Sequence, residues 1–179
     1  MIITANGKRY YLMTSLSNIF KNNTLIVTTS DLCYLIAVRS IVQNAFVGCS
    51  HLTTFNTPPN ITSLAAWVFS ANSTANSVST ITLNEGLMTI GDGCFAYTSA
   101  NPITIPSTVT RLGSMFIRWG VPSKRTLIME GTTPPTLASN ALYDVYRVYV
   151  PDDYVDTYKA ASGWTSYASY VYPVSQYTG

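Results

Sequence analysis

The sequence predicts a β-rich solenoid of stacked repeats, a quasi-linear domain without an evident cleft. A short apolar-x-apolar tripeptide recurs along the chain at intervals of 21 to 28 residues. A second apolar element follows each tripeptide after a few turn residues. The 179 residues are 47% hydrophobic and only 10% charged, a composition that excludes a disordered chain. The polar side chains are therefore mainly uncharged ones, including 24 Thr and 19 Ser. Such units cannot bury an apolar face alone, so they must stack.

The recurring tripeptides are predicted to be short parallel strands. Their third positions are Phe55, Leu83, Ile105, Met129 and Val150. The intervals between these residues are 28, 22, 24 and 21 residues, which is the period of leucine-rich repeats. Because each third position is apolar, these side chains should point into one core, and the strands should align as a parallel sheet along one side of the solenoid.

The second element is an aliphatic residue followed, four or five positions later, by a bulky one. Its copies are Ile41–Phe46, Leu64–Phe69, Ile90–Phe95, Leu112–Phe116 and Leu137–Leu142. Proline, glycine and asparagine turns such as Pro58-Pro59-Asn60 and Asn84-Glu85-Gly86 separate the strands from these anchors. Each repeat is therefore predicted as strand, turn, bulky anchor and a short helical or irregular return.

Two segments depart from this regular pattern. Residues 70–79 form a small-polar insertion, which indicates an exposed bulge. Residues 117–125 form an atypical loop in which Trp119 accompanies Arg118, Lys124 and Arg125.

The N-terminal end of the chain is predicted to cap the stack. Asn6-Gly7 lies between two short apolar segments, a strong hairpin signal. Ser17 is a candidate N-cap of a helical turn, and Thr24–Thr28 is predicted to be a further ladder strand. We therefore expect a hairpin cap and candidate docking segment over residues 1–23, the solenoid over 24–150, and a C-terminal cap and tail over 151–179.

The C-terminal segment is predicted to close the other end. Asp152 and Asp153 begin a short helix, where negative charge complements the helix dipole. Tyr154, Tyr158 and Trp164 supply aromatic area that would cover the last repeat.

Three segments carry a resemblance to a known family. Asn44–Cys49, Ile90–Phe95 and Ile103–Leu112 are similar to BspA-type leucine-rich repeats of bacterial surface antigens. Val150–Tyr167 and Val171–Val174 resemble the aromatic C-terminal cap that closes such arrays. The resemblance covers about residues 24 to 174 and implies recognition rather than catalysis, as in adhesins and surface proteins of gut bacteria and their phages.

Catalytic, cofactor and metal chemistry are not expected from these residues. Cys33, Cys49 and Cys94 show no Cys-x-x-Cys pairing and are interpreted as small buried hydrophobes. His51 is the single histidine, and Asp152, Asp153 and Asp156 are explained by the cap helix. No phosphate loop, nucleophile elbow or zinc-protease motif occurs in the sequence.

The best candidates for partner binding are side chains on the outward face of the predicted strands. They are Thr54, Thr82, Thr104, Ile128 and Tyr149. Three further candidates are Arg118, Trp119 and Tyr146, because Trp, Tyr and Arg often anchor interfaces. Tyr143 and Arg147 add two more residues of these types to the same half of the chain. Two alternatives stay open: ordinary β propensity explains the threonines, and packing of the cap and core could absorb the aromatic residues.

The charge distribution and the hydropathy of the sequence argue against two classes of partner, nucleic acid and the membrane interior. Ten Lys and Arg against eight Asp and Glu are scattered, which argues against nucleic acid, and no apolar run approaches a membrane span. The N-terminus lacks the pattern of a secretory signal. We expect a phage virion component, a fibre, spike or head-surface protein of a larger assembly, that binds a cell-surface protein or glycan or neighbouring subunits. The alternative is a bacterial cell-surface or secreted adhesin.

Overall fold

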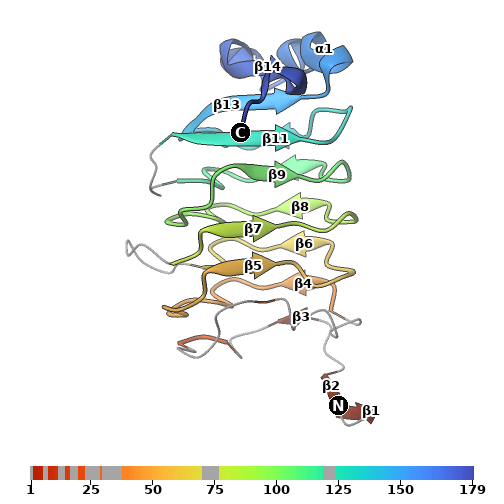
Figure 1. Ribbon diagram of the computed structural model, residues 1–179, viewed down its shortest axis with the longest axis vertical. Helices are drawn as coiled ribbons and strands as arrows, with labels where there is room; N and C mark the ends of the chain where they lie inside the picture. The colour runs from red at the N-terminus through yellow and green to blue at the C-terminus, as the bar shows by residue number, and fades with distance from the viewer. Residues whose placement is uncertain are drawn as a thin grey trace.

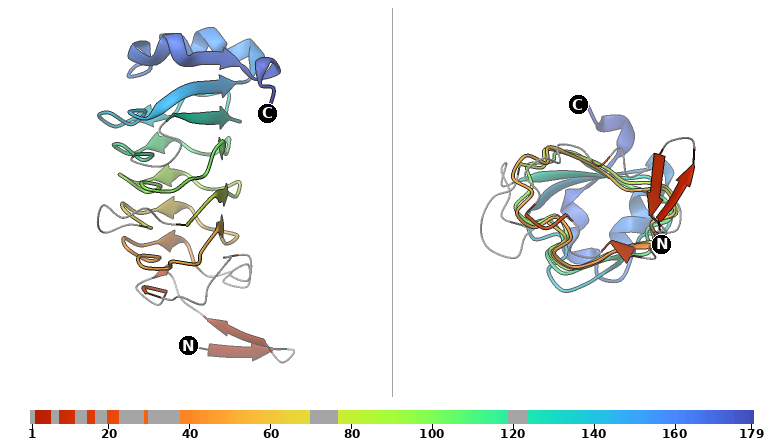
Figure 2. Two further views of the ribbon diagram at one scale, coloured as in Figure 1. Left: turned by 60° about the vertical axis from the view of Figure 1, so that its left-hand side comes forward. Right: turned by 90° about the horizontal axis from the view of Figure 1, so that it is seen from below.

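The computed structural model describes residues 2–5, 8–11, 15–16, 20–22, 29, 38–69, 77–118 and 124–179. The coils stack one on another along a long axis, with the two termini toward opposite ends of the stack (Figure 1). Viewed along that axis, the coils superpose on one ring (Figure 2). The predicted repeat solenoid is confirmed.

One side of the solenoid carries the predicted strands. They are β5 (Thr54–Asn56), β7 (Thr80–Thr82), β9 (Ile103–Ile105), β11 (Arg125–Met129) and β13 (Val145–Val150), followed by β14 (Val171–Pro173) in the cap. β5 and β7 pair with each other, and β9, β11, β13 and β14 form a second parallel group. One predicted inward residue is wrong, because Ile81 and not Leu83 aligns with Phe55.

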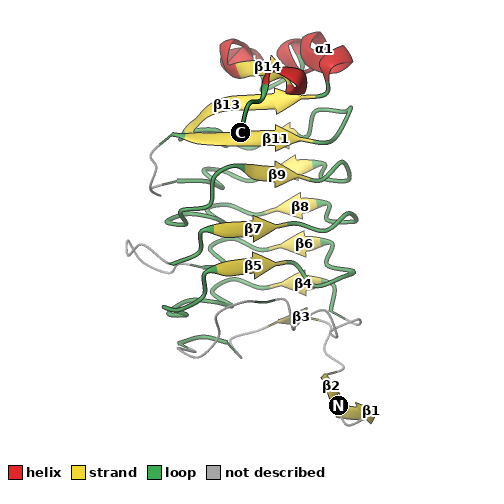
Figure 3. Cartoon of the chain, viewed as in Figure 1, coloured by secondary structure: helices red, strands yellow, loops and turns green. Residues whose placement is uncertain are grey.

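The opposite side carries a second parallel sheet that the sequence did not predict. Its strands are β3 (Ser15–Leu16), β4 (Ser40–Ile41), β6 (Ser63–Leu64), β8 (Thr89–Ile90), β10 (Arg111–Leu112) and β12 (Thr136–Leu137). The anchor elements therefore begin as strands rather than helical returns (Figure 3). Pairing between coils satisfies their backbone groups, as in the 2.8 Å bond from Gly91 N to Leu64 O.

A tight turn follows each of the strands β4, β6, β8, β10 and β12 of this second sheet, and its apex has a left-handed backbone. The apex residues are Asn44, Trp67, Gly93, Met115 and Asn140, with φ between 48° and 62°. Each lies three residues after the inward residue of its strand. Hydrogen bonds connect the apices, for example Asn44 N to Trp67 O at 3.1 Å. The turns therefore form a ladder of their own along the stack.

Between the two sheets lies a column of phenylalanine rings. Its members are Phe46, Phe55, Phe69, Phe95 and Phe116, all buried. Phe69 is central, with ring centroids 5.8 Å from Phe46, 4.8 Å from Phe55 and 6.1 Å from Phe95. The core is thus continuous from coil to coil, as stacking repeats require.

At the N-terminal end, the predicted hairpin is confirmed. β1 (Ile2–Ala5) and β2 (Lys8–Tyr11) pair antiparallel from Ile2–Tyr11 to Ala5–Lys8. β3 already joins the second sheet through β4. Ser17, the predicted strand 24–28 and most of the insertion at 70–79 lie outside the described residues. The predicted domain limits stay a prediction.

The C-terminal cap consists of η2 (Asp152–Tyr154), α1 (Val155–Ala160), η3 (Thr165–Tyr170), β14 and η4 (Val174–Gln176). Helical structure begins at Asp152, as predicted. Asp152 also accepts a 3.0 Å hydrogen bond from Ser175 N, and such bonds to Ser175 lower the pKa of Asp152.

Two of the three predicted cap aromatics cover the last coils. Tyr158 and Trp164 are fully buried, with their rings edge to face at 5.0 Å. Tyr158 Oη donates to Gly131 O and Trp164 Nε1 donates to Pro135 O, both at 2.8 Å. The prediction for Tyr154 is wrong, because this side chain is 37% exposed and is not among the residues packed against the core.

Candidate functional site

A β-bulge at the start of β13 builds the most distinctive surface feature of the protein. On β11, the neighbours Arg125 and Thr126 pair with Val145 and Arg147, so Tyr146 has no opposite residue. The bulge interrupts the alternation of the strand: Val145 is buried, and Tyr146 and Arg147 are both exposed. Bulges often redirect a side chain in this way beside functional sites.

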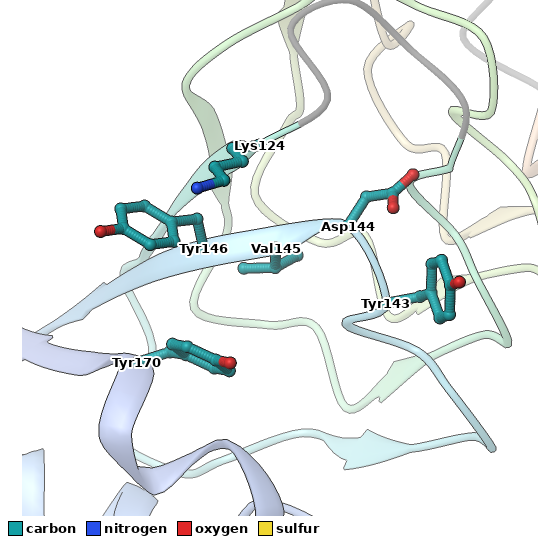
Figure 4. Close-up of a pocket in the computed structure, with 6 residues that line it drawn as sticks. All are labelled: Lys124, Tyr143, Asp144, Val145, Tyr146 and Tyr170. Carbon is teal, nitrogen blue, oxygen red and sulfur yellow. The ribbon is translucent and has the colours of Figure 1, made fainter.

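The tyrosines around this bulge line a cavity of about 390 Å³. Its lining residues are Lys124, Tyr143, Asp144, Val145, Tyr146 and Tyr170, and we call it the tyrosine pocket (Figure 4). Tyr143 is 60% exposed, Tyr146 45% and Tyr170 38%. Monomeric proteins seldom leave several aromatic rings so exposed in one place unless they contact something there.

Basic side chains pack against the rings of the tyrosine pocket. Lys124 Nζ lies 4.7 Å from the centre of the Tyr146 ring, and the Arg147 guanidinium carbon lies 5.5 Å from the same centre. Arg118 lies over Tyr143 at 5.1 Å. These cation–π contacts hold positive charge at the rim of the pocket.

Beneath the bulge, the buried side chain of Arg125 anchors the chain. Its guanidinium donates to the carbonyl oxygens of Thr98 and Ala100, and its backbone N–H donates to Asp144 O at 2.9 Å. Burial lowers the pKa of Arg125, and the charge of Asp144 opposes that shift. Arg125 therefore positions the segment from which Tyr143 and Tyr146 project.

Tyr149, which the sequence placed on the exposed face, is only 4% exposed, so that prediction is wrong. Its ring packs against Tyr177 at 5.1 Å and Tyr172 at 6.0 Å, and Arg147 Nη1 donates to its hydroxyl at 3.2 Å. A smaller cavity of about 210 Å³ lies beside it, with Asn101 among its lining residues. The cap strand β14 and the tail after it cover the face that the sequence left open.

The other outward positions divide between two rows. Thr104, Ile128 and Tyr149 align across β9, β11 and β13, and Thr104 and Ile128 are half-buried. Thr54 pairs with Thr80 on the separate β5–β7 pair. Thr82 pairs with Asn56, one row further along. The structure therefore does not bring these residues to the tyrosine pocket or into one continuous row.

Of the predicted aromatic and basic candidates, Tyr146 lines the pocket and Arg118 lies at its rim. Trp119 lies outside the described residues. Their role in partner binding stays a prediction.

The groups with the best potential for chemistry do not assemble into a reactive centre in the described part of the chain. His51 is exposed beside Ser50 Oγ at 3.5 Å. Cys49 and Cys94 are buried as predicted, and burial raises the pKa of the Cys94 thiol. Cys33 lies outside the described residues. No three His, Cys, Asp or Glu side chains gather as metal ligands within the ranges that the structure describes.

Comparison with known families decides the identity of the repeats. The model of the BspA type leucine rich repeat region matches residues 14–119 in six copies. The chain belongs to this family. Repeats of the BspA type are binding and structural modules, consistent with the stacked surfaces described above. No curated protein matches the chain. No helix among the described residues of this BspA-type protein is long and apolar enough to span a membrane.

The BspA-type match ends before the tyrosine pocket, whose residues lie between 124 and 170. Sequence reasoning therefore missed Lys124, Asp144 and Tyr170 as a group. One local signal was available: the apolar residues Val145 and Val148 are three apart, where a regular strand would place them two apart. No comparable signal brings Tyr170 of the cap to the same place.

Proposed function

We propose that this BspA-type repeat protein is a non-catalytic recognition protein that contacts its partner through the tyrosine pocket. The observation that carries the proposal is the bulge, which exposes Tyr146 and Arg147 side by side next to Tyr143 and Tyr170. Tyrosine and arginine are among the side chains that most often dominate the binding energy at interfaces. The repeats serve as the rigid support that holds them.

We further propose that the protein acts on the surface of a phage virion, as a fibre, spike or head-surface component that binds a cell-surface receptor or a neighbouring subunit. The composition supports this, because Thr, Ser and Tyr supply the polarity of a contact surface with little net charge. The alternative location is a bacterial cell surface, where the same pocket would act in adhesion. Mass spectrometry of purified virions against cell-surface fractions separates the two, and absence from virions would overturn the first.

Binding of the fluorescently labelled full chain to intact bacterial and epithelial cells tests the pocket itself. Tyr146→Ala should weaken binding by about tenfold, as for an interface anchor. Tyr154→Ala is the matched control, because Tyr154 is similarly exposed but belongs to η2 outside the pocket. Thr54→Ala tests the β5–β7 face. Equal binding by wild type and Tyr146→Ala would contradict the proposal.

A further inference from the structure

Aromatic rings, a basic side chain and an acidic side chain line the tyrosine pocket, and together they indicate which class of ligand it can bind. Its volume of about 390 Å³ is within the range of small-ligand sites. Val145 lies in the middle of the lining, with Tyr146 and Lys124 on one side of it and Tyr143 and Asp144 on the other, and the Tyr170 ring faces it from the cap (Figure 4). Aromatic faces bind the C–H faces of sugar rings, while phenol hydroxyls exchange hydrogen bonds with sugar hydroxyls.

Within the pocket, Tyr170 offers the open aromatic face. Among the described residues, its ring makes no contact with a second ring or a cation, and it is 38% exposed. The Tyr146 ring, by contrast, makes cation–π contacts with Lys124 and Arg147. The pocket therefore has a stacking side at Tyr170 and a cationic side at Tyr146.

The charges of the pocket favour an anion that also bears hydroxyl groups. Lys124, the basic lining residue, has no carboxylate within ion-pair distance among the residues that the structure describes, and it lies over the Tyr146 ring. Arg147 lies behind that ring, where it lines the smaller cavity and donates to the Tyr149 hydroxyl. The single acid of the pocket, Asp144, interacts electrostatically with the buried Arg125. Its carboxylate accepts hydrogen bonds only, so it suits a hydroxyl donor and repels a second anion.

We infer that the ligand of the tyrosine pocket is an acidic saccharide, with the sugar ring on Tyr170, hydroxyls toward Asp144 and the carboxylate toward Lys124. This inference rests on the proposed function, since it names the ligand class of the same site. An acidic peptide is less favoured, because its closely spaced carboxylates would face Asp144. The carboxylate can come from a uronic acid or from a sialic acid.

Calorimetric titration of the full chain with matched saccharides tests the inference. The probes are the galacturonic acid trisaccharide and its fully methyl-esterified form, which differ in charge, with sialyllactose against lactose as the second pair. The acidic member of at least one pair should bind about tenfold more tightly than its neutral partner, the size of one charged hydrogen bond. Added salt should reduce that difference. The pair that responds identifies the source of the carboxylate.

Variants assign the effect to named residues. Lys124→Gln should remove the preference for the acidic form, and Tyr170→Ala should abolish binding of both forms. Lys159→Gln on α1 and Tyr154→Ala are matched controls outside the pocket and should behave as wild type.

Three results would overturn the inference. The first is equal binding of the acidic and neutral forms, and the second is an acid preference that survives in Lys124→Gln. The third is absence of saccharide binding while a glutamate-rich peptide binds in a Lys124-dependent way, which would assign the pocket to acidic peptides. Failure of the proposed function is a separate result, namely unchanged cell binding by Tyr146→Ala.

Discussion

Gly93 lies against the face of the Trp67 indole ring, so closely that a Cβ atom on Gly93 would come within 2.6 Å of Trp67 Cε3. Both residues are apices of the turn ladder, with φ of 56° for Gly93 and 53° for Trp67. These two coils therefore pack closely because the large Trp67 side chain at one apex lies against a glycine, which has no side chain, at the next apex.

Gly93→Ala should destabilise the protein by about 2 to 3 kcal/mol, because it adds a steric clash to the cost of a left-handed backbone. Gly86→Ala is the control for the backbone cost alone. Gly86 has φ of 98°, and the nearest atom to a Cβ there would be Asn84 Nδ2 at 3.8 Å. Urea unfolding should place Gly86→Ala about 1 kcal/mol below wild type. Equal losses in the two variants would show that the contact with Trp67 has no steric effect.

Phe69→Ala should remove about 3 to 5 kcal/mol from the free energy of unfolding, because it opens a cavity at the centre of the phenylalanine column. Phe20→Ala provides the comparison: Phe20 is only partly buried and stacks on Phe46 alone among the rings described, at 5.3 Å. We expect it to cost less than half as much. Chemical denaturation followed by circular dichroism measures both, and a similar loss in each would contradict a core centred on Phe69.

Arg125→Met should destabilise the protein by about 2 to 4 kcal/mol, since it leaves two carbonyl oxygens in the core, those of Thr98 and Ala100, without their buried donor. The same variant should weaken cell binding, because Arg125 holds the segment that carries Tyr146. Arg111→Met is the matched control on the exposed face of β10 and should stay within about 0.5 kcal/mol of wild type. Thermal unfolding gives the comparison, and a neutral Arg125→Met would exclude the anchoring role.

Raising the pH above about 8.5 should destabilise the fold. Burial raises the pKa of both the Cys94 thiol and the Tyr158 hydroxyl. The unfolded chain releases these protons from about pH 8.5 for Cys and about pH 10 for Tyr, while the folded chain retains them. The stability that these groups contribute is therefore fully present below those values and is lost as pH rises, by up to about 1.4 kcal/mol per pH unit for each group.

Urea midpoints measured between neutral and alkaline pH test this dependence. Tyr158→Phe should remove the part that begins near pH 10. It should also cost about 1 kcal/mol at neutral pH, through loss of the bond to Gly131 O. Cys94→Ala should remove the part of the pH dependence that begins near pH 8.5. Midpoints that stay constant into the alkaline range would contradict the prediction.

The features that could be predicted from the sequence are those that each repeat encodes in itself. The tripeptides around Phe55 and Ile105 are apolar at alternate positions and recur at a fixed period, so their inward direction follows from the need to stack. Tyr158 and Trp164 could be assigned to the cap because large apolar rings at the end of a solenoid have one surface to cover. The hairpin at Asn6-Gly7 follows from the turn preference of these residues.

The features that could not be predicted depend on which segments of the chain meet. Leu83 is as apolar as Ile81, but the pairing of β7 with β5 turns Ile81 inward. Tyr149 lies in an outward row and is nevertheless buried, because residues 171–177 return across it. The two-residue strands of the second sheet have no strand signal of their own, since only pairing with neighbouring coils makes them strands.

The sequence alone determined a charge-poor stack of BspA-type repeats with an aromatic cap, because period and composition are properties of consecutive residues. Only the tertiary structure decided where a partner could bind. The bulge at Tyr146 is a mismatch between β11 and β13, and Tyr170 reaches the same pocket from the cap. Sites of this kind arise from the register between distant segments, and register is set when the strands pair.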